Sequence, residues 1–190
     1  MVYFSENEYL IRRKILKLLG GAFHVYDAHN SVVAYSKMKA FKLKEDLRMF
    51  TGEDMEKELF RIQARNIIDF AATYDVFDSS TGSKIGALRR RGLKSIFADE
   101  WLILDAQDRE IGTIKEDSLL MAFVRRFLVN IIPQSYHCTI QDRPACTFKQ
   151  NFNPFVMKIR VRFEECPDVD RNLVMAGGLL LCAIEGKQKD

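Results

Sequence analysis

The chain is poor in the residues and spacings that most often carry out chemistry. It has three histidines, four cysteines without a CxxC pair, and none of the patterns HExxH, GxSxG, GxGxxG or the phosphate-binding P-loop. The histidines do not group: His24 and His29 are separated along the chain, and His137 adjoins Cys138, so that on a strand the two would point to opposite faces. We therefore predict no catalytic residue, no metal site and no cofactor, and expect that the protein is not an enzyme.

Net charge is also small, at +3 over 190 residues, so the whole-molecule field favours no class of charged partner. Binding to anionic lipid or nucleic acid would need a local patch. A composition of 47% hydrophobic and 29% charged residues is that of an ordinary globular protein. At this length we expect one domain over residues 1–190. The oligomeric state is left open.

The scarce cysteines lie in the last third of the chain, at Cys138, Cys146, Cys166 and Cys182. Free thiols in a reducing compartment are the favoured interpretation, and a Cys138–Cys146 bridge across a hairpin is the alternative. The N-terminal residues interleave charges with apolar side chains, which is not the order of a signal peptide. The sequence shows no lipidation signal or transmembrane segment, and we expect a cytoplasmic protein, either free or peripheral at a membrane.

One long apolar run is present, at residues 173–184, where twelve consecutive residues are apolar or glycine. As a helix it would rise roughly 18 Å, well short of the ~30 Å hydrocarbon thickness of a bilayer. It is also apolar on every side, unlike a surface helix. We predict that it lies inside the protein, where Gly177 and Gly178 let other elements approach closely.

The remaining sequence repeats a hairpin pattern four times: an aromatic-led alternating run, a polar turn, and a second alternating run. Aspartate, asparagine and glycine at the turns satisfy free backbone groups or adopt positive φ. Gly86 and Gly112 indicate a bulge or close packing. The copies are residues 23–35, 74–88, 101–114 and, more weakly, 136–148.

Further alternating runs at residues 47–50, 59–64 and 155–163 bring the total to about twelve strands, mostly antiparallel. Closure into a barrel removes the exposed edges of so large a sheet. We therefore predict a mainly β fold, a closed barrel enclosing the apolar C-terminal helix. A second helix is predicted after Asp117 and before Pro133, either packed on the barrel or lying at a membrane interface.

This arrangement resembles the tubby C-terminal-like fold, and the chain looks like a bacterial-type member of the LURP-one-related group. That superfamily also contains tubby domains and phospholipid scramblases. The resemblance covers essentially the whole chain. It is carried by residues 74–78 with Gly82, 84–90, 101–105, 111–112 and 183–188.

The resemblance implies a twelve-stranded barrel around a central helix. It also points to lipids, because tubby domains hold phosphoinositide headgroups through lysine and arginine, and scramblases are associated with lipid movement and calcium. This chain lacks the proline-rich N-terminal region and the adjacent cysteines of scramblases, and the tubby headgroup residues do not map onto it one by one. Plant relatives are linked to defence.

Three basic clusters are the best functional signal in the sequence. We predict anionic-ligand binding by Arg89, Arg90, Arg91, Lys94, Arg125 and Arg126. The other clusters are Arg12, Arg13, Lys14 and Lys17, and Lys37, Lys39, Lys42 and Lys44. The alternative is that these side chains are solvated strand ends and loops. Aromatic interleaving typical of RNA binding is absent, so nucleic acid is not favoured.

The acidic residues Glu164, Glu165, Asp168 and Asp170 precede the C-terminal helix. Capping of that helix is the favoured role, and a calcium site is the alternative. Together these observations predict a non-enzymatic barrel module that binds anionic phospholipid headgroups or a protein partner through a basic rim. The alternatives are a scaffold domain without a small ligand and a scramblase-like protein that releases its C-terminal helix into a membrane.

Overall fold

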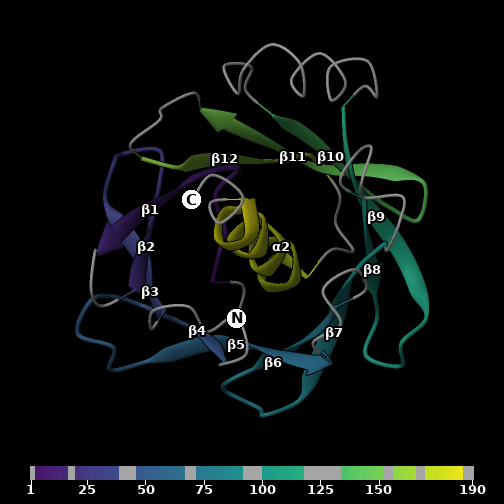
Figure 1. The fold of residues 1–190 in the computed structure, drawn as a ribbon, viewed down its shortest axis with the longest axis horizontal. Helices are drawn as coiled ribbons and strands as arrows, with labels where there is room; N and C mark the ends of the chain where they lie inside the picture. Colours follow the sequence, from purple (N-terminus) through teal and green to yellow (C-terminus); the bar gives the residue numbers. More distant parts are fainter. Residues whose placement is uncertain are drawn as a thin grey trace.

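The computed structural model describes residues 3–16, 20–38, 46–66, 72–91, 100–117, 134–151, 156–165 and 170–185. Twelve strands form a ring around one helix, α2 (Arg171–Glu185), as Figure 1 shows. The strands are β1 (Glu8–Leu16), β2 (Gly20–Tyr26), β3 (Val32–Met38), β4 (Leu47–Phe50), β5 (Glu58–Asn66), β6 (Thr73–Asp78), β7 (Lys84–Arg90), β8 (Glu100–Leu104), β9 (Glu110–Glu116), β10 (Ser135–Ile140), β11 (Arg143–Asn151) and β12 (Lys158–Phe163).

Each strand pairs antiparallel with the next along the chain, and β1 closes the barrel by pairing with β12. The closing register places Ile11 opposite Ile159 and Arg12 opposite Lys158. This confirms the predicted fold class, including the four hairpins read from the sequence. The strand expected from residue 155 begins at Lys158, and the helix expected after Asp117 lies outside the described residues.

Alternation along most strands separates a dry interior from a polar exterior. On β7 and β8 the outward side chains of Ala87, Leu102 and Leu104 are buried as well and form a separate small cluster. In β12 the side chains of Ile159, Val161 and Phe163 are buried. Arg160 and Arg162 alternate with them and are exposed. The same parity holds in β1, where Tyr9 and Ile11 point inward. The interior faces of the strands and all sides of α2 therefore form one core.

Helix α2 fills the barrel, as predicted. Its side chains from Leu173 to Ala183 are at most 3% exposed where they are hydrophobic. A Cβ on Gly178 would lie 2.9 Å from Ile11 Cδ1 and 3.1 Å from Phe148 Cε1, so the missing side chain is what lets two strands contact the helix. Within the described ranges, no helix combines the length and apolar character needed to cross a bilayer.

The hairpin turns gather at the end of the barrel where α2 begins, here called the turn end. In three of them an aspartate Oδ1 accepts hydrogen bonds from backbone N–H groups: Asp27 from Ser31, Asp78 from Ser80 and Asp105 from Arg109. At this end Arg171 of α2 also donates to the carbonyls of Phe4 and Glu6. These contacts tie the helix to the N-terminal residues.

Both glycines singled out in the sequence mark close packing. A Cβ on Gly86 would lie 2.5 Å from the Leu104 carbonyl and 2.7 Å from Leu173 Cδ2 of α2. One on Gly112 would overlap the Thr139 carbonyl on the neighbouring strand. Asp170 caps α2, because its Oδ1 accepts from the Asn172 N–H at 2.8 Å, which confirms the predicted capping role for this one of the four acidic residues. Asp168 lies outside the described residues.

Candidate functional site

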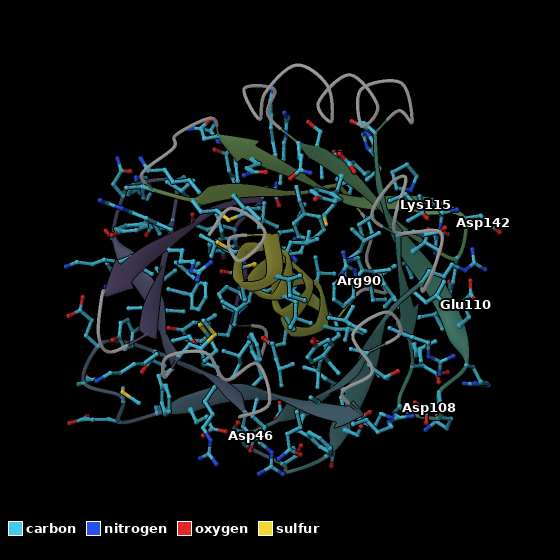
Figure 2. The ribbon with its side chains drawn as sticks, in the orientation of Figure 1. Asp46, Arg90, Asp108, Glu110, Lys115 and Asp142 are labelled. Atoms are coloured by element: carbon cyan, nitrogen blue, oxygen red, sulfur yellow. The ribbon has the colours of Figure 1, made fainter. Side chains whose placement is uncertain are left out.

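The three consecutive arginines of the predicted site face different surroundings because they follow the alternation of β7. Arg89 is opposite Leu102 and faces outward, whereas Arg90 is opposite Trp101 and faces inward. Figure 2 shows Arg90 inside the ring of strands, between α2 and the barrel wall. Arg91, just past the strand, donates from Nη1 to Glu100 Oε1 at 2.8 Å. The structure therefore does not gather the three guanidinium groups on one surface.

The other predicted site residues, Lys94, Arg125 and Arg126, lie outside the described residues. So do Lys17, Lys39, Lys42 and Lys44 of the remaining clusters. The described members of those clusters are also divided by strand alternation. Arg12, Lys14 and Lys37 are exposed, whereas Arg13 points into the barrel and is only 7% exposed.

The structure brings together a basic surface that the sequence clusters did not show. It lies on the outer face of β11, β12 and β1, which are adjacent strands in Figure 1. We call this surface the basic wall. Its six cationic side chains are Arg12, Lys14, Lys149, Lys158, Arg160 and Arg162.

Two pairs of like charge face each other directly across the strands of the basic wall. Arg12 is opposite Lys158, and Lys149 is opposite Arg160. Opposed like charges destabilise a sheet, and an isolated cross-strand pair of this kind changes stability by roughly 0.2–1 kcal/mol. The fold therefore carries a small electrostatic penalty at this place.

Few of these charges are neutralised within the molecule. Glu8 on β1 is the single carboxylate among the outward positions of these three strands, and its Oε1 lies 3.3 Å from Arg160 Nη1. The side chains of Arg12, Lys14, Lys149, Lys158 and Arg162 make no hydrogen bond or ion pair with any described residue. Within the described part of the chain, five of the six cations of the basic wall are therefore left without a neutralising partner.

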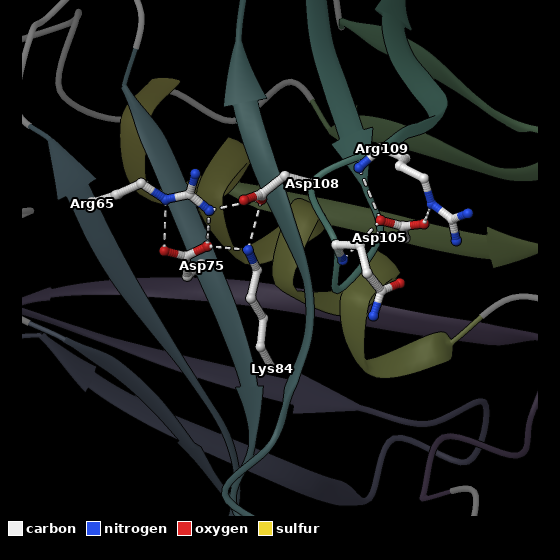
Figure 3. Close-up of polar contacts among 7 residues, drawn as sticks. Arg65, Asp75, Lys84, Asp105, Asp108 and Arg109 are labelled. Atoms are coloured by element: carbon white, nitrogen blue, oxygen red, sulfur yellow. Dashed lines mark hydrogen bonds and ion pairs between the residues drawn. The ribbon is translucent and has the colours of Figure 1, made fainter.

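The outer face across the barrel is organised in the opposite way. Figure 3 shows Arg65 of β5, Asp75 of β6, Lys84 of β7 and Asp108 of the β8–β9 turn joined in one network. Arg65 donates to Asp75 at 2.9 Å and to Asp108 at 2.8 Å, and Lys84 Nζ lies 3.0 Å from Asp75 and 2.6 Å from Asp108. The charges of the two cations and the two carboxylates cancel, and the network links β5, β6, β7 and the β8–β9 turn. We call this network the staple.

The charges of this network shift one another's protonation. Hydrogen bonds from Arg65 and Lys84 lower the pKa of Asp108 to about 2. Partial burial raises the pKa of Asp75, but hydrogen bonds from the same two cations outweigh it, and the net pKa is lowered. Both carboxylates are therefore ionised at neutral pH, and the network stays neutral overall.

The described histidine and cysteine side chains lie apart, the histidines on the outer face and the cysteines in the interior. His24 Nε2 lies 2.7 Å from Glu53 and His137 Nε2 lies 2.7 Å from Asp117, on separate outer positions. Cys138, Cys146 and Cys182 are free and buried, and burial raises the pKa of Cys182 to about 12. Across the described ranges, no three His, Cys, Asp or Glu side chains are grouped as metal ligands would be.

A family model described as LURP-one-related matches residues 32–182. No curated protein and no solved structure matches the chain. The matched segment contains β3 to β12 and most of α2, so it includes the two basic strands β11 and β12 but not β1.

Proposed function

Because this chain belongs to the LURP-one-related family, we propose that residues 1–190 form one non-enzymatic barrel module that binds anionic phospholipid membranes. The basic wall is the membrane-binding surface. The observation that supports this best is the absence of intramolecular partners, among the described residues, for five of its six cations. The module would act as a peripheral protein in the cytoplasm, as a bacterial-type member of the family.

The like-charge pairs of the basic wall fit a role in binding an anionic partner better than a role in stabilising the fold. A sheet gains nothing from placing Arg12 opposite Lys158, and the balanced network around Arg65 and Asp75 shows how the same barrel neutralises an outer face elsewhere. A juxtamembrane lysine or arginine is worth about 1 kcal/mol near an anionic leaflet. Six cations can thus supply useful affinity without a deep pocket.

Lipid is favoured over nucleic acid because the described outward side chains of β1, β11 and β12 include no aromatic group, and the nearest aromatic pair, His24 and Tyr26, lies on the neighbouring strand β2. Single-stranded nucleic acid is usually held by aromatic side chains interleaved with cations. Among the side chains that the structure describes at these positions on β1 and β12, the apolar one is Leu10. A protein partner with an acidic surface is the second candidate, and binding tests with lipid separate the two.

The arginines predicted from the sequence belong to a separate contact. Arg89 faces outward on β7 and Arg91 follows the strand, whereas Lys94, Arg125 and Arg126 lie outside the described residues. Arg90 points inward and would act on that contact only indirectly. We propose this group as a second anionic contact, to be tested apart from the basic wall.

Release of α2 into a membrane, as the scramblase-like alternative requires, is disfavoured by its burial. Burying one large apolar side chain is worth about 1.5–3 kcal/mol. The helix buries Leu173, Val174, Met175, Leu179, Leu180 and Leu181 almost completely. Bilayer hydrocarbon would keep these side chains dry, but the strand side chains that pack on the helix, among them Ile11, Phe148 and Val161, would lose their cover. Exposing the apolar interior of the barrel would cost about as much as the stability of a typical domain, roughly 5–15 kcal/mol.

Vesicle co-sedimentation tests the proposal. The protein is mixed with phosphatidylcholine vesicles that contain either no phosphatidylserine or about 30% of it. The ionic strength of the buffer is about physiological. The triple variant Arg12→Gln, Lys158→Gln, Arg160→Gln should bind the anionic vesicles about 100-fold more weakly, because three cations at about 1 kcal/mol each are lost. The control variant Lys57→Gln, Arg109→Gln, Lys115→Gln removes the same charge elsewhere and should bind as the wild type does.

Four results would contradict the proposal. Binding that is independent of phosphatidylserine would remove the electrostatic basis. Equal losses in the two triple variants would show that only net charge matters. No binding to either vesicle would favour the scaffold alternative, whereas capture of an RNA oligonucleotide in preference to vesicles would assign the basic wall to nucleic acid.

A further inference from the structure

Unpaired charge is divided between the two ends of the barrel. At the turn end, a group of exposed carboxylates makes no ion pair with any described residue: Asp54, Glu56, Glu110, Asp142, Glu164 and Glu165. They lie in the hairpin turns, at the start of β9 and just after β12. Among the cations of that half, Lys57, Arg61 and Arg162 make no ion pair within the described ranges. The unpaired charge of the turn end is therefore mainly negative.

The opposite end of the barrel, where α2 terminates, is here called the far end, and its balance is reversed. A group of cations there has no side-chain partner among the residues that the structure describes: Arg12, Lys14, Lys37, Arg89, Lys149 and Lys158. The described carboxylates of this end do have partners, because Asp46 lies near Arg48, Glu100 near Arg91 and Lys115, Glu116 near Gln134, and Asp117 near His137. The unpaired charge of the far end is therefore positive.

The far-end cations are spread around the ring of strands. Four of them belong to the basic wall on β11, β12 and β1, whereas Lys37 is on β3 and Arg89 is on β7. Figure 1 shows β3 and β7 on different sides of the ring from β12. A flat surface can approach all of these cations together only if the far end of the barrel faces it.

Two orientations on an anionic bilayer can be compared through the carboxylates that they bring near it. A barrel lying on its side presents the whole basic wall, but with it Glu8, Glu164 and Glu165 at the turn end of that wall. Glu164 follows Lys158 by six residues, or about 20 Å along a strand. With a strand tilt of about 40°, this is roughly 15 Å along the barrel axis, about twice the Debye length of ~8 Å. A barrel standing on its far end keeps these carboxylates out of range.

The dipole of α2 runs in the other direction, but its effect at the far end is offset. The C-terminal end of a helix carries about half a negative charge. Burial raises the pKa of the Cys182 thiol, in the last turn of α2, to about 12, and the nearby charge of Arg13 lowers it. The full positive charge of Arg13 therefore lies close to the helix end and exceeds the half charge there.

We propose that the barrel stands on its far end on an anionic phospholipid bilayer, with the turn end pointing away from it. This inference rests on the proposed membrane binding and specifies the surface that makes contact. That surface is the far-end part of the basic wall together with Lys37 and Arg89, whereas Arg162 contributes little. The separation of charge along the barrel axis also orients the protein during its approach, because an anionic surface attracts one end and repels the other.

Co-sedimentation with phosphatidylserine-containing vesicles tests the orientation through double variants. Lys37→Gln, Arg89→Gln removes two far-end cations outside the basic wall and should weaken binding about 30-fold. Glu164→Gln, Glu165→Gln removes two carboxylates at the turn end of the wall and should leave binding unchanged. The control Lys57→Gln, Arg109→Gln lowers the net charge as the first variant does, but at the turn end, and should bind as the wild type does.

A barrel lying on its side would give a different pattern. Lys37→Gln, Arg89→Gln would then bind as the wild type does, and Glu164→Gln, Glu165→Gln would bind about 30-fold more tightly. Either result, or an equal loss in the first variant and the control, would overturn the orientation and leave membrane binding in place. A wild type that does not bind the anionic vesicles would overturn the proposed function itself.

A second measurement keeps the orientation testable if a double variant does not fold. A fluorophore is attached at Arg89→Cys, at the far end across the ring from the wall, or at Glu164→Cys, at the turn end of the wall, each in a Cys166→Ser background. The protein is bound to an excess of phosphatidylserine vesicles that contain a nitroxide-labelled headgroup. Quenching should be stronger at residue 89 than at residue 164. Equal quenching, or stronger quenching at residue 164, would overturn the proposed orientation.

Discussion

Replacement of the two adjacent glycines of α2 by alanine tests how closely the barrel encloses the helix. Both substitutions gain about 1 kcal/mol of helix propensity, so that contribution cancels when they are compared. At Gly178 the new Cβ would lie 2.9 Å from Ile11 Cδ1, 3.1 Å from Phe148 Cε1 and 3.3 Å from Val161 Cγ2. Carbon atoms pack best at about 3.5–4.0 Å, so side chains of three strands would have to move together.

At Gly177 the crowding is lighter. One atom, the terminal methyl of Ile114, would lie 2.9 Å from the Cβ, and the next contacts are at an ordinary 3.9 Å. A terminal methyl can rotate aside, so Gly177→Ala should be neutral or more stable than the wild type by up to about 1 kcal/mol. Overpacking typically costs about 1–3 kcal/mol, so Gly178→Ala should be less stable by about 1 kcal/mol net.

Urea unfolding followed by circular dichroism measures both variants against the wild type. The expected difference between them is about 1–2 kcal/mol, or several degrees in Tm for a chain of this size. A Gly178→Ala variant as stable as Gly177→Ala would refute the reasoning, because it would show that β1, β11 and β12 do not confine the helix at this turn.

Three further predictions concern the staple, the helix cap and the thiols. Asp108→Asn should destabilise the protein at pH 7, because the ion pairs with Arg65 and Lys84 lower the folded-state pKa of Asp108 from 3.8 to about 2. In acid unfolding curves, the stability difference from the wild type should therefore shrink as the pH falls from about 4 toward about 2. A difference that stays undiminished at pH 2 would contradict this pairing. Asp170→Ala should cost about 1 kcal/mol in urea unfolding through loss of the cap on Asn172, whereas Asp170→Asn should keep most of it, and equal losses would argue against capping. In a Cys166→Ser background, a thiol reagent at pH 8 should label Cys138, Cys146 and Cys182 only after denaturation, since all three are buried and burial raises the pKa of Cys146 and Cys182; rapid labelling of the native protein would show that the barrel opens readily.

Local patterns predicted most of the architecture. The repeated hairpins follow from alternation and turn residues such as Asp78 and Asp105, whose side chains bond the turn backbone as expected. The buried helix follows from an apolar run too uniform for any surface. Gly86, Gly112 and Gly178 were interpreted correctly as places of close approach. Each of these inferences depends on residues close together in sequence.

The candidate site was harder to predict because it depends on register between distant strands. The sequence groups Arg12, Arg13 and Lys14 as one cluster, although a strand sends Arg13 to the opposite face. The alternation of Tyr9, Ile11 and Arg13 could have shown this. The basic wall could not be found in that way, because it requires the closing pair of β1 with β12, which are separated by almost the whole chain.

The most direct test of the functional account is to identify the face of the barrel that contacts a bilayer. A fluorophore is placed at Asn151→Cys, on the basic wall, or at Thr81→Cys, in the β6–β7 turn across the ring (Figure 1), each in a Cys166→Ser background. The protein is then bound to phosphatidylserine vesicles that contain a nitroxide-labelled headgroup. The account predicts strong quenching at residue 151 and little at residue 81. Equal quenching at the two positions, or stronger quenching at residue 81, would contradict it.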